Sequence, residues 1–373
     1  MAKAKKTKKT KKASIDPTDR AAALHEQAQL LRDDGDARAA KAPCLKALAL
    51  FDEHSGPNHP DVANVRIELG AIYEELGDYD RAQKELETAN AILAKWPLTG
   101  EHALTLARLR VHALAQLGSL AVTRGDYRAA EKAHKKALEL ARKKLPEEET
   151  ASAMNGLAIV YKYTAKWEPA ERLYRQALAL LEKVSRDPKA DPAIATIFHN
   201  LGGLEHSRGR FEKGEPFARR SVEIRERAHG KDHPAVAADV AALAAILDGC
   251  GKPEEAEPLY RRAIAIFTKR YGKEHFEVAF NLAQLAVLYQ SLGKTAKADA
   301  HYKKALPLLE KSLGKEHPTV ALTLANLASL RLEQKKIAEG KKLCARALRI
   351  YEQTLGKRHP DTIDCKKALA ELG

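Results

Sequence analysis

The sequence predicts an all-α fold, a solenoid built from eight pairs of helices and closed by a C-terminal capping helix. Three observations predict it. Residues 271–313 recur in the next block at a spacing of 42 residues, a tight-turn position recurs eight times, and small residues recur at fixed distances from that turn. A period of this length is the signature of a repeat array, in which each unit buries its apolar face only by stacking on its neighbours.

The turn divides each repeat into two apolar stretches with 3.6-residue spacing, which predicts two antiparallel helices. Glycine suits such a turn because it adopts positive φ without steric cost. The turn positions are Gly35, Gly77, Gly125, Ala165, Gly209, Gly251, Gly293 and Lys335. We therefore assign residues 14–359 to eight repeats, residues 360–373 to the capping helix, and residues 1–13 to a disordered basic tail.

Small side chains stand seven residues before each turn and five and twelve residues after it. They allow helix axes to approach closely while neighbouring leucines fill the space beside them. The first of these sets is Ala28, Gly70, Gly118, Ala158, Gly202, Ala244, Ala286 and Ala328. This register resembles the tetratricopeptide repeat over nearly the whole chain.

A second motif, G-x-x-H-P, separates successive repeats, as at residues 313–318 (LGKEHP) and 355–360 (LGKRHP). Glycine ends one helix, proline opens the next, and the histidine ring can cap it. The motif and the 42-residue period look like the kinesin-light-chain type of tetratricopeptide repeat. That resemblance implies a right-handed superhelix whose first helices line an inner groove for peptides and partner proteins.

The resemblance places candidate binding residues on the groove-facing side of the first helices. Repeats three to five supply polar and basic side chains there, whereas repeats six to eight supply an apolar wall that suits an amphipathic helix or the chain's own C-terminal element. The candidates are His112, Asn155, Lys162, His199, His206, Phe280, Val287 and Leu322, with the amides Asn200, Gln284 and Asn326 beside them.

Two interpretations stay open for some of these residues. The amides either bond a peptide backbone or tie neighbouring helices together. His199 and His206 lie two turns apart on one helix face, which would permit a metal pair, although ordinary groove polarity is the preferred interpretation. Cys44 and Cys344 take a position held elsewhere by Tyr174 and are expected in the core.

The formal net charge of +14 is concentrated at the N-terminus. Such a basic arm can bind nucleic acid or acidic surfaces through charge alone, or it can act only as a solubilising tail. Seven lysines and no acid fall within the first twelve residues: Lys3, Lys5, Lys6, Lys8, Lys9, Lys11 and Lys12.

Motifs for catalysis are absent from the sequence, which has no phosphate loop, zinc-protease motif or nucleophile elbow. The four cysteines show no paired spacing, and no segment is long and apolar enough to span a membrane. The linker histidines are one repeat apart and cannot share a metal ion. We expect a cytoplasmic, non-catalytic adaptor without cofactor or metal that binds a peptide or protein; a nucleic-acid-associated protein is the alternative.

Overall fold

The computed structural model describes residues 16–371, which form 17 α-helices and no strand in that span. The helices are α1 Pro17–Asp33, α2 Ala37–His54, α3 Pro60–Glu75, α4 Tyr79–Ala94, α5 Ala103–Thr123, α6 Tyr127–Lys144, α7 Glu147–Tyr163, α8 Trp167–Val184, α9 Pro192–Ser207, α10 Phe211–His229, α11 Pro234–Gly249, α12 Pro253–Tyr271, α13 Phe276–Ser291, α14 Thr295–Leu313, α15 Pro318–Glu333, α16 Ile337–Thr354 and α17 Pro360–Glu371.

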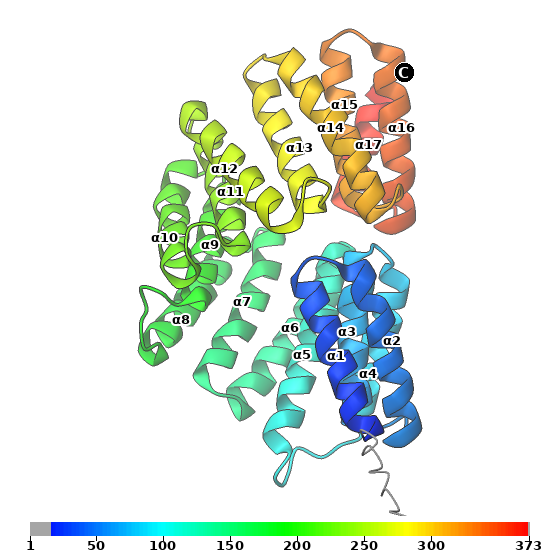
Figure 1. The fold of residues 1–373 in the computed structure, drawn as a ribbon. Helices are drawn as coiled ribbons and strands as arrows, with labels where there is room; N and C mark the ends of the chain where they lie inside the picture. Colours follow the sequence, from blue (N-terminus) through cyan, green and yellow to red (C-terminus); the bar gives the residue numbers. More distant parts are fainter. Residues whose placement is uncertain (1–15, 372–373) are drawn as a thin grey trace, which may run out of the picture.

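Each odd-numbered helix from α1 to α15 packs against the even-numbered helix that follows it, and α17 packs on α16 (Figure 1). The predicted solenoid of eight helix pairs and a capping helix is confirmed. All eight turn residues have φ between 54° and 80°, including the non-glycine residues Ala165 and Lys335. The lysines of the N-terminal tail lie outside the described residues.

The linker histidines cap the helices that follow them, as their sequence context indicated. In all five G-x-x-H-P or G-x-x-H-F linkers, the histidine Nδ1 accepts a hydrogen bond from the backbone N–H two residues on, at 3.1–3.3 Å. Asp191 replaces histidine before α9 and caps it in the same way, accepting from Ala193 N at 2.8 Å. These caps satisfy N–H groups that have no partner within the helix.

The small residues allow close packing within each helix pair. A methyl group added at Gly70 would lie 2.6 Å from the Leu86 side chain, and one added at Gly118 would lie 2.4 Å from the ring of His134. Cys44 and Cys344 are buried, as expected. The Cys344 Sγ lies 3.6 Å from the Sγ of Cys365 in α17, which ties the capping helix into the core.

The superhelix meets itself after about six repeats. Figure 1 shows α13–α17 stacked over α1–α4, and a single cluster of buried apolar residues includes members from both groups. We call this contact between α12–α17 and α1–α5 the seam. Phe276 and Phe280 pack against the cluster, so Phe280 contributes to the apolar core around the seam.

The seam repeats one contact three times. The rings of His275, His317 and His359 cover the turns at Gly35, Gly77 and Gly125, where an added methyl group would lie 2.6–2.9 Å from the ring in each case. His275 Nε2 lies 3.3 Å from Gly35 O, and Arg270 pairs with Asp34 at 2.5 Å. Helix-capping histidines thus also join successive turns of the superhelix.

Candidate partner-binding groove

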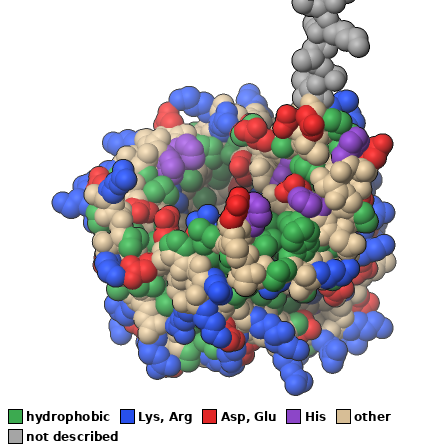
Figure 2. All heavy atoms as spheres, turned by 90° about the horizontal axis from the view of Figure 1, so that it is seen from below, with side chains coloured by type: hydrophobic (Ala, Val, Ile, Leu, Met, Phe, Trp, Pro, Cys, Tyr) green, Lys and Arg blue, Asp and Glu red, His purple; other side chains and the backbone are tan. Residues whose placement is uncertain are grey.

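The inner wall of the superhelix is formed by the odd-numbered helices. From α1 to α15, each odd-numbered helix contacts the next one along the chain, as α3 contacts α5 and α5 contacts α7; the pair α11 and α13 is the exception. Figure 2 shows that one end of the molecule is hollowed, with hydrophobic side chains, histidines and a few acidic side chains gathered around the depression. The candidate binding residues all lie on odd-numbered helices, namely α5, α7, α9, α13 and α15.

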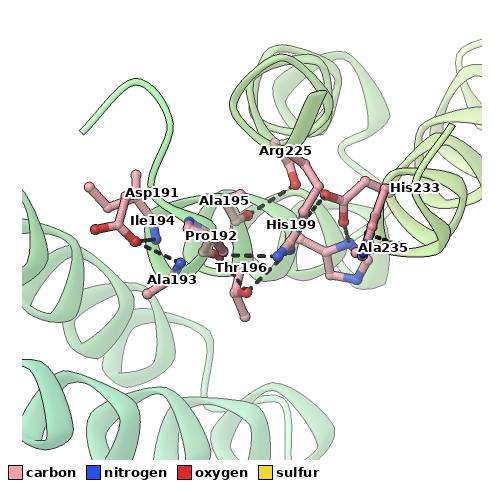
Figure 3. Close-up of polar contacts among 12 residues, drawn as sticks. Asp191, Pro192, Ala193, Ile194, Ala195, Thr196, His199, Arg225, His233 and Ala235 are labelled. Atoms are coloured by element: carbon pink, nitrogen blue, oxygen red, sulfur yellow. Dashed lines mark hydrogen bonds and ion pairs between the residues drawn. The ribbon is translucent and has the colours of Figure 1, made fainter. Parts of the chain in front are cut away.

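His199 on α9 is held by a buried carboxylate. Its Nδ1 lies 2.8 Å from Asp239 Oδ1, and Asp239 also accepts from Arg225 Nε at 2.8 Å. Arg225 donates further to Pro192 O and to Thr196 Oγ1, as seen in Figure 3. Although Asp239 is only 3 % exposed and burial alone would raise its pKa, the hydrogen bonds and charges of His199 and Arg225 lower it. The network joins α9, α10 and α11, and it fixes one nitrogen of His199.

Asn155 and Asn200 bond to each other across the wall. The Asn200 Nδ2 donates to Asn155 Oδ1 at 2.7 Å, which links α7 to α9. This contact matches the interpretation in which groove amides tie neighbouring helices together.

Lys162, His206 and His112 are polar groups on the wall whose surroundings disfavour charge. Desolvation lowers the pKa of each, and the charge of Lys162 lowers the pKa of His206 further. Lys162 Nζ lies 4.7 Å from the ring centroid of Tyr163, and no carboxylate among residues 16–371 pairs with it. His206 packs edge-on against Phe211, and His112 lies 3.3 Å from Gln116 Nε2. Among the described residues, no group of three or more His, Cys, Asp or Glu side chains is arranged so that it could hold a metal ion.

At the other end of the wall, α13, α14 and α15 form an open cavity of about 310 Å³ whose lining residues are mostly polar. Its lining is Val287, Gln290, Ser291, Tyr302, Asn326, Ser329 and Glu333. Val287 is 37 % exposed, and Leu322 on the neighbouring turn is 40 % exposed. The side chains of Gln284 and Asn326 make no hydrogen bond within residues 16–371, in contrast to Asn200. Two exposed apolar side chains and two free amides in and beside this mostly polar lining are suited to an extended or helical segment, whose backbone the amides can bond.

Sequence reasoning missed several charged groups on or near this wall. Arg32 pairs with Glu68 and Glu75, whereas Glu74 accepts only from Thr123 Oγ1. Desolvation raises the pKa of Glu277 to about 7. Arg32 and Glu74 stand three residues before their turns, the repeat position that also holds Lys162 and His206, so extending the groove register to the first two repeats could have found them.

The architecture defines a helical-repeat protein whose odd-numbered helices line an inner surface. The tetratricopeptide repeat family model matches residues 19–95, 100–183, 193–269, 237–311, 277–339 and 319–372. The chain therefore belongs to the tetratricopeptide repeat family, and half of it is similar in sequence to a kinesin-light-chain-related protein.

Known proteins similar to this chain include one sequence relative and two solved structures. Protein KINESIN LIGHT CHAIN-RELATED 2 of Arabidopsis thaliana is 30% identical over 191 residues, covering 50% of this chain but only 27% of the relative. The Rap conjugation gene regulator of plasmid pLS20, solved with the Phr* peptide, has a TM-score of 0.60 at 16% identity, covering 90% of this chain and 96% of its own. The quorum sensor NprR from B. thuringiensis has a TM-score of 0.59 at 14% identity, covering 91% and 89%. The two structures show a shared fold.

In the described part of the chain, no helix combines the length and the apolar character needed to cross a lipid bilayer.

Proposed function

We propose that this protein is a non-catalytic, cytoplasmic adaptor that holds a peptide or a segment of a partner protein against the inner wall of its superhelix. The observation that carries the proposal is the cavity between α13 and α15, where Val287 and Asn326 line an open surface and the amides of Asn326 and Gln284 have no partner within the described residues. The pLS20 Rap regulator, which shares the fold, was solved with a peptide, which supports a peptide-sized guest here.

Each part of this wall has a defined role in the proposal. Val287 and Leu322 supply apolar contact area, while Asn326 and Gln284 bond the guest's backbone. In the free protein these partly exposed amides bond water, and each exchange of water for a guest backbone group contributes about 0.5–1.5 kcal/mol to binding. Lys162, His112 and His206 extend the wall toward repeats three to five and offer polar contacts to the rest of the segment.

Site-specific photo-crosslinking tests the proposal. A photoreactive phenylalanine analogue at Leu322 is expected to crosslink a guest segment in native extract, whereas the same analogue at Leu45, which is similarly exposed but lies on the outer helix α2, is not. Asn326→Ala combined with Gln284→Ala should weaken capture by about tenfold, because two backbone hydrogen bonds are lost. Equal crosslinking at both positions would reject the inner wall as the binding surface.

Asn200→Ala is the matched amide control. Its partner is Asn155 within the protein, so its loss should lower stability and leave capture by the folded protein nearly unchanged. A loss of capture equal to that of the double variant would instead place the binding site at repeats four and five.

The lysine-rich N-terminus supports a second candidate function, association with nucleic acid or another acidic surface. Seven cations without a nearby acid predict binding that falls steeply with salt and disappears when residues 1–13 are deleted. A flat salt dependence would reject this function without affecting the adaptor proposal.

A further inference from the structure

The outer surface of the molecule carries a cavity of about 540 Å³ between α6 and α8, and its lining differs in chemical character from the inner wall. Its floor is apolar and contains the nearly buried Leu138, Leu157 and Leu173. Its rim includes the guanidinium groups of Arg142 and Arg172, both on exposed residues. Because α6 and α8 are the second helices of their pairs, this cavity opens away from the groove.

Two of the other repeat interfaces carry an ion pair that this interface lacks. The residue seventeen positions after one turn can pair with the residue eleven positions after the next turn. Glu226 pairs in this way with Arg262 at 2.6 Å, and Glu310 pairs with Arg346 at 2.7 Å. Each pair bridges consecutive outer helices, with the carboxylate always supplied by the earlier repeat.

Between α6 and α8 the two equivalent positions are Arg142 and Gln176, both of which line the cavity. The carboxylate of the bridge is replaced by a cation, and the arginine by a neutral amide. Neither Arg142 nor Arg172 has an ion-pair partner within residues 16–371. The two lysines of the lining, in contrast, are neutralised on their own helix, Lys135 by Glu131 and Lys143 by Glu139, each at 2.7 Å.

Helix α6 adds to this local excess of positive charge. Four more of its cations are exposed and make no ion pair in the described chain: Arg128, Lys132, Lys136 and Lys144. An uncompensated basic surface attracts anionic partners over several ångströms, and guanidinium groups bind carboxylates with particular geometric specificity.

We propose that this cavity is a second docking site, which binds an acidic peptide segment that also carries a bulky apolar side chain. A carboxylate of the segment takes the place of the missing glutamate between Arg142 and Arg172, and the apolar side chain lies on the leucine floor. The apolar floor favours a peptide over a nucleic acid, whose backbone has no aliphatic side chain to bury. This site does not depend on the inner groove.

Fluorescence anisotropy with synthetic probes tests the site on the full-length chain. The probe is a labelled 12-residue peptide containing four Glu and two Leu residues; the comparison peptides replace its Glu residues by Gln or its Leu residues by Ser. We expect the parent peptide to bind, and each replacement to weaken binding by about tenfold or more, because charge and apolar contact both contribute.

The decisive variant introduces the bridge found at two other interfaces. Arg142→Glu with Gln176→Arg recreates the Glu226–Arg262 arrangement, so the protein should stay folded while peptide binding falls by about tenfold or more. Lys132→Gln is the matched control, since it removes the same net charge from an exposed residue of α6 that does not line the cavity, and it should reduce binding less than about threefold.

Three results would overturn the proposal. One is equal loss of binding in Lys132→Gln and in the bridge-restoring variant. Another is equal binding of the Ser-substituted peptide, which would show charge attraction alone. The third is tighter binding of a 12-nucleotide oligothymidine than of the peptide, with loss in the bridge-restoring variant, which would assign the site to nucleic acid.

Discussion

Identical turns serve different purposes in two regions of this superhelix. The turns at Gly35, Gly77 and Gly125 are covered by histidine rings of the seam, whereas a methyl group added at Gly209, Gly251 or Gly293 would meet nothing within 4 Å. The backbone is the same in both regions, with φ between 66° and 80° at all six glycines. Local sequence therefore determines the turn, and the path of the superhelix determines whether that turn also forms a tertiary contact.

The linkers show the same division. His233 caps its helix and stacks on the neighbouring His229, and His59 caps its helix and packs against Trp96. His317 caps its helix and also lies on Gly77. A histidine that caps a helix can thus also join two distant turns of the superhelix, while its capping hydrogen bond stays the same.

The largest expected effect comes from adding a methyl group beneath the seam. Gly77→Ala and Gly251→Ala both introduce a side chain at positive φ, which should cost about 1 kcal/mol in each case. Gly77→Ala also places the methyl group 2.9 Å from the His317 ring, so we expect a further loss of about 1–2 kcal/mol.

Urea unfolding and small-angle scattering distinguish the two contributions. The Gly77 variant should unfold at lower urea concentration than the Gly251 variant and should have a larger radius of gyration. Equal midpoints and equal radii would mean that the seam contributes nothing measurable.

Acid should weaken the seam. Burial lowers the pKa of His317 to about 4, from the usual 6.5, and also lowers the pKa of His275 and His359. The unfolded or opened chain binds protons to these histidines at a higher pH than the closed one, so their contribution to closure is complete above pH 6.5 and is lost as pH falls toward 4. Glu277, whose pKa is raised to about 7, contributes in the opposite direction, but it is one group against three. Scattering at pH 7.5 and pH 5 should show expansion at the lower value.

His317→Asn separates this effect from other buried histidines, because asparagine still caps a helix but does not titrate. The variant should expand less between pH 7.5 and pH 5 than the natural protein. His59→Asn, at a linker outside the seam, should expand as the natural protein does. The buried His134, whose pKa is also lowered to about 4, adds an acid-dependent loss of stability that both variants retain.

The ion pair across the seam should have the smallest effect. Arg270 and Asp34 are 53% and 58% exposed, so their attraction is screened by solvent. Arg270→Ala should lower the free energy of unfolding by less than about 1 kcal/mol. In 1 M salt the variant and the natural protein should have the same free energy of unfolding. A difference that persists in salt would indicate that the arginine contributes through packing.

The sequence predicted those structural features that are determined by residues close together in the chain. Turn conformation, histidine capping and the burial of Cys44 and Cys344 follow from residues within one repeat, and the repeat period identified them together. The seam could not be predicted, because it depends on the rotation and rise accumulated over about six repeats. A small error in each step changes which linker meets which turn.

The groove was predictable as a surface but not as a set of bonds. Contacts such as His199 with Asp239 and Asn200 with Asn155 join residues 40 and 45 positions apart, and they depend on the offset between adjacent repeats. The repeat pattern placed these side chains on the inner wall. It could not show which of them already have partners and which, like Asn326, remain open.

Crosslinking across the seam tests its closure most directly. Asp34→Cys with Arg270→Cys places two thiols where the natural side chains are in contact, although 236 positions separate them in the sequence. A short bis-maleimide should link them rapidly in the folded protein, whereas Asp34→Cys with Ala228→Cys, one repeat earlier, should not form the link. Equal linkage in the two variants, or none in the first, would contradict a superhelix that closes on itself.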